Sequence, residues 1–328
     1  MTFITPMMAA AMPKDKLVLE PGKWAVEEKF DGHRLIVSVF ENAFHQIVVK
    51  AWSRDGLCRT DLHPSEMRSI APHLLKAMAQ LPNGIYDGEL FVPGKRSYGV
   101  TEETNRPDLV YTVFDVLELL GVSTVAQTYD ERRRYLEEIF SKLTLTGINL
   151  AASWNVLDLK HVSSICKRIW KRDGEGVILK RRASRYSPGK RPKGDWIKIK
   201  QLQSAVLTVI GFEASRGSIQ NRGPYAMVKL RDDEGYETTV KTRNDEECRK
   251  FEEEFRTMDV HQMRADIEGT DRKTAKQRNF MGVFNNDPMI EPLVMAHPAI
   301  GRKLRIEYQE RTPDGSYRHP RWDRWEDE

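Results

Sequence analysis

The chain has 328 residues, of which 40% are hydrophobic and 30% are charged. This composition excludes a disordered chain and a single small module, and it predicts a globular protein of about two domains. Lys and Arg together number 52 and Asp and Glu 48, so the formal net charge is only +4. A uniformly basic protein is thereby excluded, whereas a local basic surface is not.

Cysteine usage and hydropathy indicate the compartment. The three cysteines, Cys58, Cys166 and Cys248, lie far apart and lack the spacing of a zinc site or a disulfide framework. The N-terminal segment is fairly apolar but has no basic region of a secretion signal, and no stretch approaches the ~18 apolar residues of a membrane span. We therefore expect a soluble, cytoplasmic protein that is monomeric and does not associate with membranes.

The first 200 residues contain runs with the composition and punctuation of strands: 24–30, 35–40, 47–52, 84–92, 109–117, 177–180 and 196–200. The first two runs flank Asp31-Gly32, a dipeptide typical of tight turns, so a β-hairpin is predicted there. A helix is predicted over 62–81. Thr128 and Glu131 have capping-box spacing before apolar residues at helical intervals, which predicts a second helix starting at about residue 129.

After residue 203 the pattern changes to short β runs at 205–212, 225–230, 237–242 and 303–309, interrupted by a charged helix candidate over 244–258. Such a pattern suits a small β-barrel, and an oligonucleotide-binding (OB) barrel is the obvious candidate. Two domains, 1–203 and 204–328, are therefore predicted. The polar stretch from about 259 to 290 is long for a barrel loop, so it is either a functional insertion or poorly ordered.

The densest group of reactive side chains lies in Glu27-Glu28-Lys29-Phe30-Asp31-Gly32-His33-Arg34. Positions two apart share one face of a strand, so Glu27 and Lys29 are expected to face the same space. Lys29 is either a solvated strand end or a nucleophile. A nucleophilic amine must be neutral, and nearby cations favour that state.

Three other segments carry charges at strand spacing. Lys198 and Lys200 share a face of one run, Asp87 and Glu89 share a face of another, and Glu175 stands at the entry to a third. Each alone is also what an ordinary amphipathic strand or turn looks like. Together they supply what nucleotidyl transfer needs, namely a nucleophile, carboxylates for a divalent cation and ribose hydroxyls, and cations for the charge that develops on pyrophosphate.

The motif Lys29-x-Asp31-Gly32-x-Arg34 resembles the nucleotidyltransferase signature of ATP-dependent DNA ligases, RNA ligases and mRNA capping enzymes. The later segments match the other motifs of that superfamily in order. Pro6-Met7, Pro21-Gly22-Lys23-Trp24 and Arg318-His319-Pro320-Arg321-Trp322 make the chain more similar to DNA ligases, over about residues 6–325. It most resembles the compact two-domain ligases of phages and bacteria.

The resemblance implies an α+β fold, in which a nucleotidyltransferase (adenylation) domain with antiparallel sheets is followed by an OB-fold barrel. It implies ATP and Mg²⁺ as cofactors and nicked duplex DNA as the partner. The implied reaction passes through a lysyl-AMP and a DNA-adenylate before the nick is sealed. An RNA ligase or a capping guanylyltransferase remains an alternative within the superfamily, and a non-enzymatic DNA-binding protein is a more remote one.

The resemblance also implies a role for each motif residue. Lys29 carries AMP covalently, and Glu27 accepts a hydrogen bond from the adenine amino group. Phe114 stacks on adenine, unless it is an ordinary core residue. Arg34 lies near the ribose and the nick phosphate, and Arg54 contacts the nucleotide or the nick. Glu89 binds the ribose or a metal, Glu175 binds a metal, and Lys198 and Lys200 contact the α-phosphate.

Two basic segments complete the expectations. Residues 180–200 hold nine basic residues and one acid, and we expect contacts to DNA phosphates, rather than a merely solvated loop, from Arg181, Arg182, Arg185, Lys190, Arg191 and Lys193. Ligases usually end in an Arg-x-Asp-Lys motif that closes over ATP. Here Arg321-Trp322-Asp323-Arg324 either serves with arginine in the place of lysine, or the motif is lost. Residues 326–328 are expected to point away from ATP.

Overall fold

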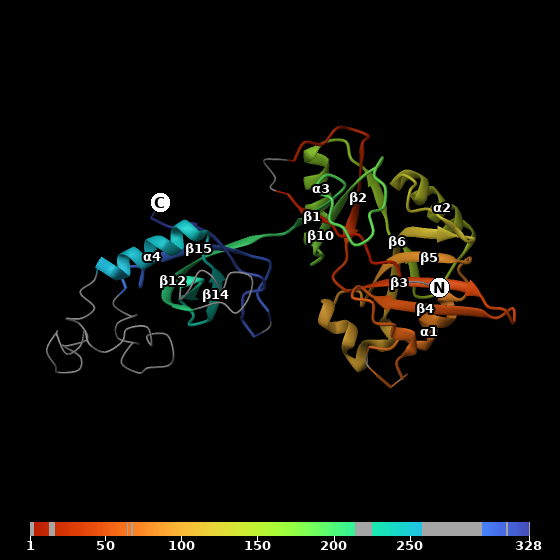
Figure 1. Cartoon of the computed structure of the whole chain (residues 1–328), viewed down its shortest axis with the longest axis horizontal. Coiled ribbons are helices and arrows are strands. Elements are labelled where there is room, and N and C mark those ends of the chain that lie inside the picture. Colours follow the sequence, from red (N-terminus) through yellow and green to blue (C-terminus); the bar gives the residue numbers. More distant parts are fainter. Residues whose placement is uncertain are drawn as a thin grey trace. The chain divides into compact units, whose positions relative to one another are not determined.

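The computed structural model describes residues 3–12, 17–63, 65–66, 68–213, 225–257, 297–312 and 314–327. The chain divides into two compact units, residues 1–201 and 202–328 (Figure 1). None of the helices in the described ranges is both long and apolar enough to cross a membrane.

The first unit is built on two sheets. One has the strand order β1-β11-β10-β2-β9, with bounds Ala10–Ala11, Trp196–Lys200, Gly176–Arg181, Trp24–Lys29 and Ser153–Asn155. The other has the order β4-β3-β5-β6-β7, with bounds Ile47–Ser53, His33–Glu41, Gly84–Phe91, Val110–Leu119 and Val122–Ser123, and β8 (Ile148–Leu150) also pairs with β6. Most pairs are antiparallel as expected, but β1 joins β11 and β8 joins β6 in parallel, so both sheets are mixed.

Helices bury one face of each sheet. α1 (Pro72–Met78) and α2 (Tyr129–Lys142) pack on the β3–β5–β6 sheet through Leu74, Met78 and Leu136. α3 (Leu159–Trp170) covers the β10–β2 sheet with Val162, Ile165 and Ile169, which lie at helical spacing. Burying one such aliphatic side chain contributes about 1.5–3 kcal/mol, so these two cores hold the sheets that carry the polar residues.

The predicted hairpin at Asp31-Gly32 is wrong. β2 and β3 belong to different sheets and do not pair, and Gly32 does not have a positive φ. A Cβ at Gly32 would lie 2.2 Å from the carbonyl oxygen of Leu90. Glycine is therefore needed because the chain passes close to β5 as it crosses from one sheet to the other.

The predicted helix over 62–81 is confirmed only in part, since among the described residues of this range the α-helix is limited to α1. Ala71, just before it, has an extended backbone (φ −63°, ψ 138°). Proline disfavours a helical conformation in the residue before it and is well suited to the first helical turn, so Pro72 sets the start of α1. Short 3₁₀ turns lie nearby: η2 (Arg59–Asp61), η3 (Ser97–Thr101) and η4 (Glu103–Asp108).

The capping box at Thr128 and Glu131 is confirmed, because each side chain bonds the backbone N–H of the other residue. By contrast, α3 was not predicted. Its signals are present in the sequence: Asp158 accepts the N–H of His161 as an N-cap, and the apolar residues that follow recur at helical intervals.

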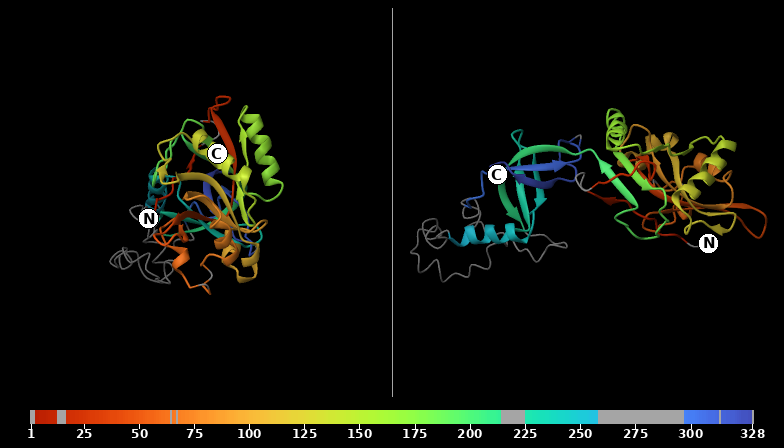
Figure 2. Two further views of the ribbon diagram at one scale, coloured as in Figure 1. Left: turned by 90° about the vertical axis from the view of Figure 1, so that its right-hand side faces the viewer. Right: turned by 90° about the horizontal axis from the view of Figure 1, so that it is seen from above.

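The second unit is a five-stranded antiparallel sheet of order β14-β13-β12-β15-β16, with bounds Glu237–Lys241, Met227–Arg231, Gln203–Glu213, Lys303–Tyr308 and Arg321–Trp325. The two edge strands, β14 and β16, approach each other, and Figure 2 shows the sheet curling round with α4 (Asp245–Thr257) at one end. The expected strands and helix are confirmed, and β16 is an additional strand. Residues 259–290, for which an insertion or poor order was predicted, lie outside the described ranges.

Candidate active site

A cleft of about 930 Å³ in the first unit is lined by residues of both sheets. Its walls include every residue of the first unit that the sequence assigned to the nucleophile or to the nucleotide: Lys29, Glu27, Arg34, Arg54, Glu89, Phe114, Lys198 and Lys200. These side chains come from β2, β3, β5, β6 and β11 and from the turn after β4, so the fold brings together positions up to 173 residues apart in the sequence.

The register of three strands explains how one wall forms. β10 lies between β2 and β11, and Gly176 is opposite both Lys29 and Lys200. Two positions along, Ile178 is opposite both Glu27 and Lys198. Because side chains two apart share a face, the four charged residues project from the same side of the sheet. The expected shared face of Glu27 and Lys29 is therefore confirmed.

Gly176 allows β10 to approach the backbone of β11 closely in this wall. It has φ +149°, and a Cβ there would lie 2.1 Å from the carbonyl oxygen of Ile199. Glu175, directly before it, forms ion pairs with both Lys29 and Lys200. The nearest charged partner of Lys29 is thus a carboxylate that it shares with a second lysine, an arrangement that the sequence spacing did not reveal.

Glu27 lies deeper in the cleft and is 2% exposed. One of its oxygens accepts from the Tyr129 hydroxyl and the other is 2.7 Å from the Lys180 Nζ, while Arg133 lies 3.9 Å away. Lys180 is itself only 1% exposed, and burial lowers its pKa against the opposing effect of Glu27. Lys180, which the sequence placed in a basic loop, is therefore a buried partner of Glu27.

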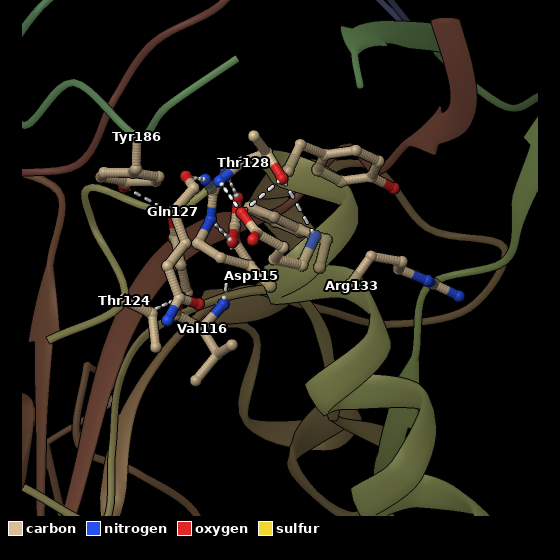
Figure 3. Close-up of polar contacts among 12 residues, drawn as sticks. Asp115, Val116, Thr124, Gln127, Thr128, Arg133 and Tyr186 are labelled. Carbon is tan, nitrogen blue, oxygen red and sulfur yellow. Dashed lines mark hydrogen bonds and ion pairs between the residues drawn. The ribbon is translucent and has the colours of Figure 1, made fainter. Parts of the chain in front are cut away.

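A buried polar network lies at the start of α2, beside Asp115 and Gln127 (Figure 3). Arg132 donates to both oxygens of Asp115, at 2.6 and 2.9 Å, and both residues are at most 1% exposed. Arg132 also donates to the carbonyl of Gln127, at 2.7 Å. This network ties the first turn of α2 to β6, and Arg133 points away from it in Figure 3, toward Glu27.

The opposite wall carries Arg34 and Glu89, which lie opposite each other on β3 and β5. Arg34 donates to both oxygens of Asp87, whose carboxylate also accepts from the Tyr186 hydroxyl at 2.6 Å. Burial disfavours the charge on Arg34, but the attraction of Asp87 outweighs it and raises the pKa of Arg34. Arg34 is therefore held as a fixed cation in the cleft.

Glu89 differs from Asp87 because it makes no hydrogen bond or ion pair within the described part of the chain. Burial raises the pKa of Glu89 to about 7, although Arg34 and Lys29 act in the opposite direction. A half-buried carboxylate without a bonded partner is suited to bind a ligand or metal.

Phe114 lines the cleft and also packs against a small apolar cluster that contains Trp196. Two cations lie near its ring, the Arg34 guanidinium at 4.6 Å and the Lys180 ammonium at 4.7 Å. The indole Nε1 of Trp196 is buried and has no hydrogen-bond partner in the part of the chain that the structure describes. This end of the cleft is therefore aromatic, as a base-binding pocket requires.

Most but not all of the predicted DNA-binding side chains are exposed to solvent. Arg181, Arg185, Lys190, Arg191 and Lys193 are exposed, and Arg191 reaches the cleft wall. Arg182 is half-buried and pairs with Asp130 at 2.5 Å. In the second unit, Arg321 and Arg324 lie exposed on β16, while Glu326 and Asp327 pair with Arg305 and Arg302.

No group of three His, Cys, Asp or Glu side chains suited to a metal is found in the described ranges. Mg²⁺ is usually held by one or two carboxylates together with substrate phosphates and water, so it does not need such a group. Glu89, unbonded in the cleft, and Glu175, next to Lys29, offer that number of carboxylates. The donor set therefore fits Mg²⁺ bound together with a phosphorylated ligand.

Comparisons with known proteins agree with this geometry. A family model for the ATP dependent DNA ligase domain matches residues 6–200, more than half of the chain. The multifunctional non-homologous end joining protein LigD of Mycobacterium bovis is 32% identical over 203 residues, which cover 61% of this chain and 24% of that protein. A DNA ligase of Methanothrix thermoacetophila is 30% identical over 254 residues, covering 71% of this chain and 42% of the relative. The chain thus spans less than half the length of these curated relatives.

Solved structures show the same fold at lower identity. A Lig E DNA ligase, described as binding DNA with a minimal scaffold, aligns over 99% of this chain and 100% of its own length, with a TM-score of 0.61 and 15% identity. A structure designated Pmar-Lig_Pre aligns over 98% of this chain and 67% of its own, with a TM-score of 0.66 and 17% identity. With the ligase-domain match covering both sheets and the whole cleft, the chain belongs to the ATP-dependent DNA ligase family.

Proposed function

We propose that the chain is an ATP-dependent DNA ligase that seals nicks with a 5′-phosphate and a 3′-hydroxyl. The observation that carries this is the single sheet face on which Lys29, Glu27, Lys198 and Lys200 meet in one cleft. It places a primary amine between an aromatic pocket and a set of cations. Few reactions other than nucleotidyl transfer to lysine need that combination.

In the first step the Lys29 Nζ attacks the α-phosphorus of ATP, the bond to pyrophosphate breaks, and a phosphoramidate to AMP forms. Lys29 must lose a proton for this, and Glu175 is the carboxylate bonded to its Nζ. Lys198 and Lys200 bind the α-phosphate during this step. Glu27, held by Lys180 and Tyr129, accepts a hydrogen bond from the adenine amino group. Glu89 and Glu175 would hold Mg²⁺, which supplies charge neutralisation on the phosphates when bound.

In the later steps AMP passes from Lys29 to the 5′-phosphate of the nick, and the 3′-hydroxyl displaces AMP to form the phosphodiester. Arg181, Arg182, Arg185, Lys190, Arg191 and Lys193 would contact DNA phosphates, and Arg34 and Arg54 would lie near the nick. Their exposure, apart from Arg34 and Arg182, supports such contacts. We also propose that the active protein is a monomer.

We propose in addition that residues 204–328 form an OB barrel whose Arg321 and Arg324 act on ATP. The strand order β14-β13-β12-β15-β16 with approaching edges, and a helix between the third and fourth strands of the unit, support a small closed barrel. The ion pairs of Glu326 and Asp327 with arginines of their own unit support the view that these acids do not face ATP.

The test is adduct formation with labelled ATP, followed by sealing of nicked duplexes. The parent protein should form a lysyl-AMP adduct, Lys29→Ala should form none, and the exposed Lys142→Ala should match the parent. Lys29→Ala should still seal a nick that already carries 5′-AMP. Labelling by GTP instead of ATP would identify a capping enzyme, sealing of nicked RNA but not DNA an RNA ligase, and absence of any adduct a non-enzymatic protein.

A further inference from the structure

A second group of cations lines the same cleft, and no role was assigned to any of its members from the ligase motifs. It consists of Arg59 on η2, Arg68 in the turn before α1, and His33 at the start of β3. None of the three contributes to the lysine-bearing wall, which is built from β2, β10 and β11.

Arg59 is the unusual member, because it is only 3% exposed. Its Nε donates to the carbonyl of Arg68, but its Nη2 is buried and has no hydrogen-bond partner among the residues that the structure describes. Buried polar groups are almost always hydrogen-bonded, and a buried cationic donor without an acceptor is costly. Arg59 lines the cleft, and a turn of its guanidinium toward an anion bound there would give this buried donor an acceptor.

The surroundings of Arg59 are positively charged. Burial, followed by the repulsion of Arg106 and Arg68, lowers the pKa of Arg59 to about 10, and no acidic group opposes the shift. His33 responds in the same way, since burial and then Arg59 and Arg68 lower its pKa, and only Asp31 acts weakly in the other direction. Arg68 is exposed, and its guanidinium has no hydrogen bond or ion pair within the described part of the chain. None of the three side chains is bonded to a carboxylate within the described ranges, so the group is suited to an anionic ligand.

We propose that Arg59, Arg68 and His33 form a subsite for a phosphate group, separate from the Lys198 and Lys200 pair. The planar donor forks of arginine suit phosphate oxygens, and His33 can add a ring N–H. The inference rests on the proposed function for the source of that phosphate, which is either a DNA strand next to the nick or the β,γ-phosphates of ATP. Both sources present the same chemistry to these three side chains.

The subsite itself is tested without any ligation reaction. Pyrophosphate is titrated into the full-length parent, Arg59→Met and Arg68→Met by calorimetry, with Arg134→Met as a charge-matched control on the exposed side of α2. Losing one charge-assisted fork should weaken pyrophosphate binding by about tenfold or more in the first two variants and leave the control at the parent value. Equal dissociation constants for Arg59→Met, Arg68→Met and Arg134→Met would overturn the subsite.

A stability measurement separates this role from a structural one. In phosphate-free buffer, Arg59→Met should melt at or above the parent temperature, because an apolar side chain of similar length replaces a buried cation without an acceptor. A large drop in the melting temperature would show that the guanidinium holds the fold and would overturn the proposal. Arg68→Met, which is exposed, gives the binding result without this ambiguity.

Two further measurements, nick binding and the ATP KM of adenylation, identify the source of the phosphate. If it belongs to DNA, Arg59→Met and Arg68→Met should raise the apparent dissociation constant for a pre-adenylated nick by about tenfold and change the ATP KM of adenylation less than about twofold. If it belongs to ATP, the ATP KM rises and the dissociation constant for the pre-adenylated nick stays at the parent value. A parent protein that forms no AMP adduct would refute the proposed function, whereas the pyrophosphate titration would still decide the subsite.

Discussion

Replacing Glu89 by glutamine is expected to make the protein more stable while it loses activity. Burial raises the pKa of Glu89 from 4.5 to about 7. Because the folded-state pKa lies above the unfolded one, the folded protein binds more protons between these values, and its stability falls as pH rises through that window. At pH 8 the carboxylate is ionised in both states, and the folded protein bears the full cost of its charge.

The size of the effect follows from the shift. One pKa unit corresponds to 1.36 kcal/mol. The free energy of unfolding of Glu89→Gln should therefore exceed that of the parent by about 3 kcal/mol at pH 8 and by less than about 1 kcal/mol at pH 5. For a unit of about 200 residues, the gain at pH 8 raises the melting temperature by about 6–12 °C. Glutamine keeps the shape of the side chain but cannot hold a cation as a carboxylate does, so sealing should fall sharply.

The assay is denaturant unfolding of parent and variant at pH 5 and pH 8 with EDTA present, since a bound cation would offset the charge. Glu118→Gln, on β6 of the same sheet but outside the cleft, serves as the control and should change little at either pH. A Glu89→Gln variant that is equally or less stable than the parent at pH 8, or that gains the same amount at both pH values, would refute the reasoning.

Three further outcomes are expected. Arg132→Ala should destabilise the first unit by about 3–5 kcal/mol in denaturant unfolding, because it leaves Asp115 charged and buried; an effect as small as that of the exposed Lys142→Ala would contradict this. Replacing Arg181 and Arg185 together by Ala should reduce the slope of log K against log salt for nick binding by about 1.8, with adenylation unchanged, and an unchanged slope would exclude phosphate contacts. Arg321→Ala or Arg324→Ala should slow adenylation far more than sealing of pre-adenylated nicks, whereas deleting 326–328 should affect neither; parent-like adenylation in both variants would show that the second unit does not act on ATP.

The strand-borne part of the site could be predicted because a period of two is a local property. Once 24–30 and 196–200 are assigned as strands, the shared faces of Glu27 with Lys29 and of Lys198 with Lys200 follow without knowledge of the sheet. Which strands pair is not local, and this is why Asp31-Gly32 was interpreted as a hairpin. The same dipeptide serves a tight turn or a close crossing, and only the position of Leu90 distinguishes the two.

Residues whose role depends on a distant partner could not be assigned from sequence. Lys180 ends the predicted strand run 177–180 and precedes two arginines, so it was counted with the basic stretch 180–200, although its partner Glu27 lies 153 positions earlier. Arg59 gave no signal at all, because its significance is the lack of an acceptor at its Nη2. Local patterns indicate side-chain direction, but charge compensation is decided by the packing of the whole unit.

The crossing at Gly32 makes the spacing of the Lys29-x-Asp31-Gly32-x-Arg34 motif a mechanical constraint on the cleft. Only residues 30–32 separate β2 from β3, and the backbone from Lys29 to His33 can span at most on the order of 14 Å. The wall that bears Lys29 and the wall that bears Arg34 are therefore tethered at this end, and any widening of the cleft must occur by pivoting about it. One inserted residue would either lengthen the tether or, if the connection kept its length, shift one strand by one position and direct Lys29 or Arg34 out of the cleft.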